Sequence, residues 1–233
     1  NVGADTNYTA PSSKTFTVAV TLVSKTLSSN SWAVIKAVSD AGQGANYWSV
    51  GATKSVTING KVGATTISSL KVDAFIIGFN HNSGKEGSNR IHFLLGKISG
   101  KFVGLVDSSY GSTTSTSGAF TMNTSNTNSG GWGSSQMRSK VLGSASSPTS
   151  PTANTLLAAL PSDLRAVMKS CTKYTDNNGG GNTASNVSST TDYLFLLSEY
   201  EVFATHQYCN DAEPNYQACL LYTSPSPRDR TRS

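Results

Sequence analysis

The 233-residue chain has few charged residues, few cysteines and no long hydrophobic run. Charged side chains make up 13% of the sequence, about half of the usual share. No stretch approaches the roughly 18 consecutive apolar residues that a membrane-spanning helix needs, so we expect no membrane insertion. The three cysteines show no C-x-x-C spacing, so the sequence predicts neither a structural zinc site nor a disulfide framework.

Small polar residues and glycine dominate the composition instead. The chain contains 37 Ser, 27 Thr, 18 Asn and 21 Gly. This composition favours short strands, tight turns and long loops over a helical bundle. A hydrophobic share of 36% with a modest net charge of +5 indicates a folded chain and not a disordered one.

The last fifteen residues, 219–233, differ in character from the rest of the chain. The segment from Cys219 to Asp229 resembles the conceptual translation of a transposase-based sequencing adapter, so we expect it to lie outside the fold. A natural disordered tail is the alternative. Without residues 219–233 the net charge falls to +3 and the remaining Lys and Arg are scattered, which argues against a nucleic-acid partner.

Hydrophobic periodicity predicts an α+β fold with strands in two groups and helices between them. The expected strands are 15–23, 54–58, 61–65, 70–79, 91–95, 102–106 and 193–197, and the expected helices are 31–39, 135–142, 152–160, 161–169 and 198–203. Asn30 is the expected N-cap of the first helix, and Ser198 with Glu201 has the spacing of a capping box. Asn59-Gly60 predicts a type I′ hairpin turn, which needs positive φ at both central positions.

The histidines do not predict a metal or catalytic site. His81 follows a strand without a second His nearby, so we expect it to be a turn residue bonded to neighbouring backbone. His92 lies in an alternating strand and is expected to point outward. His206 and Cys209 form a lone pair of potential ligands, which is too few for a site. Cys171 and Cys209 could form one disulfide or remain unrelated.

The other polar candidates are also interpreted as structural. The acidic residues Asp73, Asp107, Asp163 and Asp192 fall on different expected elements, with Asp163 near a helix start beside a surface partner, Arg165. Close backbone approach at Gly130-Gly131, burial of Trp132 and hydrogen bonding by Arg138 are expected. The alternating amides Asn123, Asn126 and Asn128 bring no carboxylate, so they predict loop packing and not a calcium site.

Seven segments, in this order, resemble the domain-of-unknown-function family 6273 across about residues 31–218. They are 46–51 (NYWSVG), 76–82 (IIGFNHN), 122–132 (MNTSNTNSGGW), 136–138 (QMR), 160–165 (LPSDLR), 173–176 (KYTD) and 190–203 (TTDYLFLLSEYEVF). That family occurs in secreted or surface proteins of gut Firmicutes and in tailed phages of the gut.

The resemblance implies an irregular, loop-rich fold similar to C-type lectins and formylglycine-generating enzymes, with a short antiparallel sheet and several short helices. It divides the chain into a linker or upstream β segment (1–28), the lectin-like domain (29–218) and a non-native tail (219–233). Family members continue into a Tyr-rich segment and a Trp-Trp-Leu-Arg-Ser-Pro-like motif that is not found here. We therefore expect a C-terminally truncated domain.

The expected function is a non-enzymatic binding module on a virion or cell surface, outside the cell, that recognises a host glycan or surface protein. The sequence assigns no catalytic, metal or cofactor residue, and it leaves the ligand-binding residues undefined. A structural or decoration component of a phage virion is the alternative. An enzyme like the formylglycine generators is the weakest of the three, because that chemistry would need paired reactive cysteines.

Overall fold

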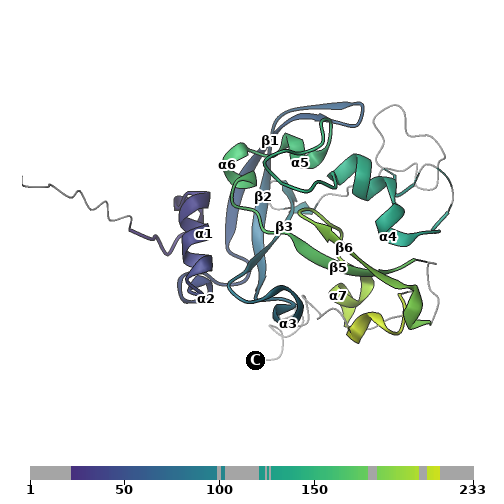
Figure 1. Cartoon of the computed structure of the whole chain (residues 1–233). Coiled ribbons are helices and arrows are strands. Elements are labelled where there is room, and N and C mark those ends of the chain that lie inside the picture. Colours follow the sequence, from purple (N-terminus) through teal and green to yellow (C-terminus); the bar gives the residue numbers. More distant parts are fainter. Residues whose placement is uncertain are drawn as a thin grey trace, which may run out of the picture.

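Two antiparallel sheets and a set of short helices make up the computed structural model, which describes residues 22–98, 101–102, 121–123, 125, 127–177, 183–204 and 209–215 (Figure 1). Sheet A has four strands and sheet B has two. Helices and antiparallel sheets alternate along the chain, so the predicted α+β class is confirmed.

Sheet A contains β1 (Thr53–Val62), β2 (Thr65–Phe79), β3 (Ile91–Ile98) and β4 (Lys101–Phe102), paired in that order. The predicted strands at 70–79 and 91–95 are confirmed within β2 and β3.

Strand β2 forms the centre of the hydrophobic core. Val72, Ala74 and Ile76 face the main core, while Phe75 and Ile77 form a second, smaller hydrophobic cluster. Burial on both faces explains why this stretch reads as a continuous apolar run and not as an alternating one.

Helix α1 (Trp32–Asp40) lies alongside sheet A, followed by α2 (Gly44–Tyr47) (Figure 1). Its residues Trp32, Ile35 and Val38 are buried, as their spacing predicts. The cap differs by one position from the prediction, because the side chain of Ser31, and not Asn30, accepts the hydrogen bond from Val34 N–H.

The β1–β2 hairpin does not turn at Asn59-Gly60, so that prediction is wrong. Pairing continues past Gly60 to Val62 opposite Thr65, with a register shift between Ile58 and Gly60. A turn at Gly60 would remove Val62, which is 1% exposed, from the core. The turn lies instead at Gly63, whose N–H donates to Asn154 O at 2.8 Å.

Sheet B pairs β5 (Cys171–Asp176) with β6 (Val187–Asp192) in antiparallel register. The prediction of a strand at 193–197 is wrong, since these residues follow β6 without joining either sheet. The strand that pairs with β5 is instead β6, a polar, Ser/Thr-rich segment whose β-branched Thr side chains suit a strand. The apolar residues after it pack against the core by their side chains alone.

The remaining helices are short. They are α3 (Ser83–Glu86), α4 (Gly131–Ser134), a π-helix (Met137–Leu142), α5 (Leu156–Ala159), α6 (Ser162–Arg165), α7 (Glu199–Phe203) and 3₁₀ turns at Leu27–Ser29, Ala184–Asn186 and Glu213–Asn215. The helices predicted at 152–160 and 161–169 are thus much shorter than expected. The capping box at the start of α7 is confirmed, with both reciprocal hydrogen bonds present.

Several predictions lie outside the described residues. They concern nearly all of the strand at 15–23, the strand residues 103–106, and Asp107, Asn126, His206 and the tail 219–233. Among the helices that are described, none combines the length and apolarity required to cross a bilayer.

Candidate functional site

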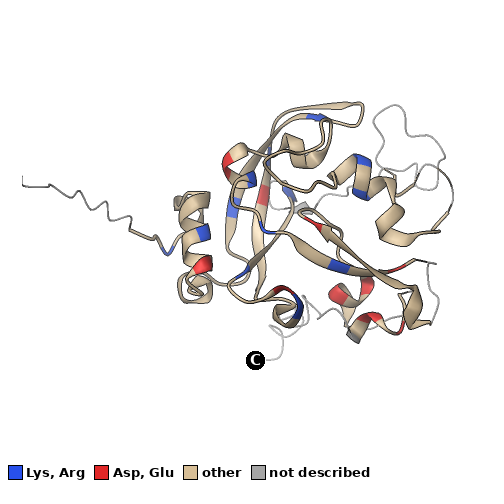
Figure 2. Cartoon of the chain, viewed as in Figure 1, with Lys and Arg blue, Asp and Glu red and all other residues tan. Residues whose placement is uncertain are grey.

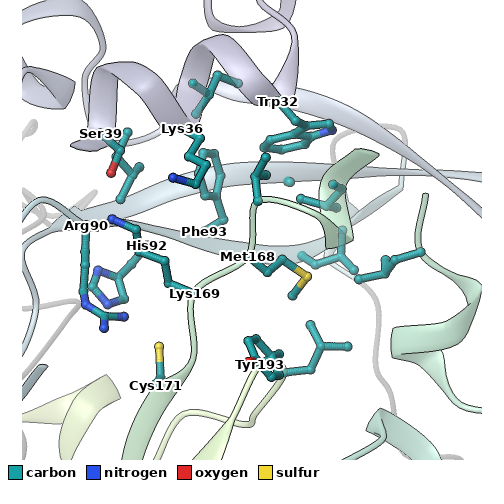
Figure 3. Close-up of a pocket in the computed structure, with 18 of the residues that line it drawn as sticks. Trp32, Lys36, Ser39, Arg90, His92, Phe93, Met168, Lys169, Cys171 and Tyr193 are labelled. Atoms are coloured by element: carbon teal, nitrogen blue, oxygen red, sulfur yellow. The ribbon is translucent and has the colours of Figure 1, made fainter. Parts of the chain in front are cut away.

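A cavity of about 190 Å³ lies between α1, strand β3 and the chain that joins α6 to β5 (Figure 3). Aromatic rings form much of its wall, contributed by Trp32, Phe93, Tyr193 and Phe195. Trp32 and Phe93 meet edge to face, with ring centroids 5.5 Å apart. This geometry is favourable for aromatic pairs and fixes the two rings at the cavity wall.

One end of the cavity is polar and cationic. Figure 3 shows Lys36, Arg90, His92 and Lys169 on one side, away from the apolar end near Met168. The cavity therefore combines an apolar surface with charge at one end, which is typical of sites that orient a ligand.

Asp40 organises the two lysines of this end. Lys169 Nζ lies 2.6 Å from Asp40 Oδ1, and Lys36 bonds the other carboxylate oxygen. The hydrogen bonds from Lys169 and Lys36 hold the pKa of Asp40 below its usual value. Both lysines stay at the cavity rim, since each is tethered to the same carboxylate.

Arg90 connects the floor of the polar end to sheet B. Its Nε donates to Glu86 O at 3.0 Å and its Nη1 donates to Ser170 O at 2.7 Å. The guanidinium thereby ties the end of α3 to the residue that precedes β5. Arg90 therefore holds the end of α3 and the start of β5, which are far apart in the sequence, next to each other at the polar end of the cavity.

A buried polar triad lies next to this end. Glu201 Oε1 lies 3.2 Å from His81 Nε2, and Oε2 accepts from Lys173 Nζ and from Ser198 N–H. Burial raises the pKa of Glu201, but hydrogen bonding to His81 and the charge of Lys173 outweigh it and lower the pKa overall. Every carboxylate oxygen has a partner, so the triad holds α7 against β5 and the end of β2.

Three further potential ligands converge beside the triad. One oxygen of Glu86, one ring nitrogen of His92 and the Cys171 sulfur all lie within 4.8 Å of one another. The rings of His81 and His92 meet edge to face at 5.4 Å. Burial raises the pKa of the Cys171 thiol to about 12.

Both described histidines differ from the sequence prediction. His92 does not point outward, since its side chain is only 7% exposed, and His81 bonds the distant carboxylate of Glu201 and not neighbouring backbone. A register shift between Ile76 and Gly78 in the pairing of β2 with β3 alters the inward and outward alternation near His92. The sequence carries no signal for that shift.

The expected burial of Trp132 and hydrogen bonding by Arg138 are confirmed. Trp132 Nε1 donates to Asp192 Oδ2 at 3.0 Å, and Arg138 Nε donates to Asp192 Oδ1 at 2.8 Å.

The described acidic residues Asp73, Asp163 and Asp192 lie on β2, α6 and β6, with no two paired. Arg165 donates to the carbonyl oxygens of Leu160 and Pro148 and not to Asp163.

The loop amides and the cysteines also have clear places. Asn123 donates to Thr127 O and accepts from Gln136 N–H, which is the loop packing that the sequence predicts. Cys171 and Cys209 are free thiols, so the possible disulfide between them does not form. Burial raises the pKa of Cys209 to about 11.

The charged residues of the described chain are spread over many elements, and Figure 2 shows Lys and Arg on both sheets and on helices at opposite sides of the molecule. Acidic residues lie among them and also on α7. Comparison of the chain with protein-family models, curated proteins and solved structures gives no match. The cavity and the polar groups beside it therefore carry the functional argument.

The sequence does not predict that Glu86, Lys173 and the apolar wall of the cavity lie together in one site. Glu86 and Cys171 are 85 positions apart, and no local motif links them. The sequence predicts Glu201 only as half of a capping box, and in the structure it fills that role while also bonding His81 and Lys173.

Proposed function

We propose that the chain is a non-enzymatic binding domain of C-type-lectin-like fold, displayed outside the cell on a phage particle or bacterial surface. Its cavity takes up part of a host surface protein. The observation that carries this proposal is the cavity itself, which is aromatic and apolar along most of its wall and cationic at one end.

The apolar wall favours a protein partner over a glycan. A protein can insert one apolar or aromatic side chain into the cavity and set an acidic side chain near Lys36 and Lys169, which together make a typical anchor. A sugar presents hydroxyl groups on most sides, and an apolar wall would leave some of them without hydrogen-bond partners.

The surrounding polar groups support a binding role over an enzymatic one. The carboxylate of Glu201 is already bonded by His81, Lys173 and Ser198. Burial raises the pKa of the Cys171 thiol to about 12 and that of the Cys209 thiol to about 11, which disfavours the reactive thiolates that a formylglycine-generating chemistry needs. These groups are therefore best explained by support of the cavity.

Binding of the purified, labelled chain to a panel of gut bacterial cells tests the proposal. We expect saturable binding that is lost when cells are treated with protease and retained when their glycans are oxidised with periodate. Met168→Glu places a carboxylate in the apolar part of the cavity and should weaken binding at least about tenfold, or ~1.4 kcal/mol.

A matched pair of charge reversals controls for general electrostatics. Lys36→Glu changes the cavity rim, whereas Lys61→Glu makes the same change at an exposed position of β1, outside the cavity lining. Only the first should reduce binding. Loss of binding after periodate alone would favour a glycan ligand, and a chain that binds no cell but forms a closed oligomer would favour a structural virion component.

A further inference from the structure

The most unusual feature of the polar end is a buried, incompletely bonded group made of Glu86, His92 and Cys171. The side chains of Glu86 and His92 are only 3% and 7% exposed. Glu86 Oε2 and His92 Nδ1 are buried without a hydrogen-bond partner in the described part of the chain. Buried polar atoms are nearly always bonded, so the unsatisfied Glu86 oxygen indicates a missing partner. It lies 3.8 Å from His92 Nε2, and that nitrogen, not Nδ1, is the one that a metal between the two side chains would bind.

The three side chains are held in place by the surrounding backbone. Glu86 Oε1 accepts from the N–H of Thr172, the residue after Cys171. Arg90 bonds both the carbonyl of Glu86 and the carbonyl of Ser170, the residue before Cys171. Both neighbours of Cys171 are thus tied to the end of α3, and such supporting hydrogen bonds are what orient ligands around a metal.

The geometry points to a zinc site formed by Glu86, His92 and Cys171. Carboxylate, imidazole and thiolate are all common zinc ligands, and a sulfur ligand disfavours Ca²⁺ or Mg²⁺. Glu86 and a Cys171 thiolate would together balance the charge of one Zn²⁺. The sequence predicted no metal ligand, because these residues become neighbours only through the pairing of distant elements.

The distances are close to what zinc requires. Usual zinc bond lengths place tetrahedral ligand atoms roughly 3.4 Å apart. Glu86 Oε2 and His92 Nε2 are 3.8 Å apart, and the full set of ligand atoms lies within 4.8 Å, so a small inward movement closes the site. His92 and Cys171 also line the cavity, and Figure 3 shows the Cys171 sulfur pointing toward His92.

Zinc titration of the full chain, stripped with a chelator, tests the site directly. Native mass spectrometry should show one zinc per chain, and zinc should raise the unfolding temperature. In a competition assay with a chromophoric chelator, Cys171→Ser and His92→Gln should each weaken zinc binding by more than about 100-fold. That exceeds the usual effect of removing a group that only orients a ligand.

The other cysteines provide the matched control. Cys209→Ser should bind zinc like the parent protein. The double variant Cys209→Ser/Cys219→Ser keeps Cys171 as its only thiol. With Co²⁺ in place of zinc, this protein should show a thiolate-to-cobalt charge-transfer band and the intense visible bands of tetrahedral cobalt.

The double variant decides the matter even if Cys171→Ser fails to fold, because its spectrum reports the Cys171–metal bond in a protein that retains all three ligands. Absence of the charge-transfer band, or zinc affinity that Cys171→Ser leaves unchanged in a folded protein, would overturn the inference. These measurements use no cell or partner, so their outcome is separate from that of the binding function.

Discussion

Single buried carboxylates join parts of this molecule that are remote in sequence. Asp192 is 1% exposed and accepts hydrogen bonds from Trp132, Arg138 and Thr190. Glu201 does the same for His81 and Lys173. Such groups stabilise a fold only when all their bonds are made, because a buried charge without partners is costly.

Asp192→Asn should therefore destabilise the protein by about 2–3 kcal/mol, since it removes the charge that Arg138 faces and replaces an acceptor with a donor. Urea unfolding followed by circular dichroism measures the change. Asp163→Asn is the matched control, because Asp163 is exposed in the first turn of α6 and its loss should cost at most about 1 kcal/mol. Equal effects of the two substitutions would contradict the role given to Asp192.

At the scale of elements, α4 and β5 approach so closely that only glycine fits between them. Gly131 begins α4 with a φ of +52°, and a Cβ atom at this position would lie 1.9 Å from Asp176 O. The glycine pair Gly130-Gly131 predicts this close backbone approach. The contact sets where Trp132 enters the core and so where Asp192 receives its hydrogen bonds.

Gly131→Ala should destabilise the fold by several kcal/mol, about 3 or more, because the backbone of β5 must move and the positive φ is strained. Gly133→Ala, two residues along the same helix, meets only Thr190 Cγ2 at an ordinary 3.5 Å and should be neutral or slightly stabilising. Thermal unfolding of both variants makes the comparison. A well-folded Gly131→Ala protein with unchanged stability would show that α4 and β5 are not in this contact.

Elements with a strong local signal were predictable from the sequence. The three-residue spacing of Trp32, Ile35 and Val38 identifies α1, and Ser198 with Glu201 identifies the start of α7. The turn at Gly63 was not predictable, because it depends on burial of Val62 and on a hydrogen bond to Asn154, 91 residues later.

The candidate site was even less accessible to sequence reasoning than the elements. His92 is placed by a register shift in sheet A, and Cys171 reaches it through the pairing of sheet B and the bonds of Arg90. Each residue has an ordinary local context. Their chemistry emerges only from tertiary proximity, which no short motif encodes.

At the scale of the whole described molecule, the cavity is assembled from both halves of the chain. The first half supplies α1 and β3, and the second supplies the stretch from α6 to β5 and the residues after β6 (Figure 1). The polar triad and Arg90 fix these halves relative to each other. We propose this shared cavity as the place where the domain contacts a host surface protein.

Site-specific photo-crosslinking tests that claim most directly. A photoreactive amino acid replaces Met168 inside the cavity or, as a control, the exposed Lys61 of β1, and each protein is irradiated on cells that bind the parent chain. We predict that position 168 captures a defined host protein and that position 61 does not. Capture from position 61 but not from position 168, in proteins that bind equally well, would contradict the account.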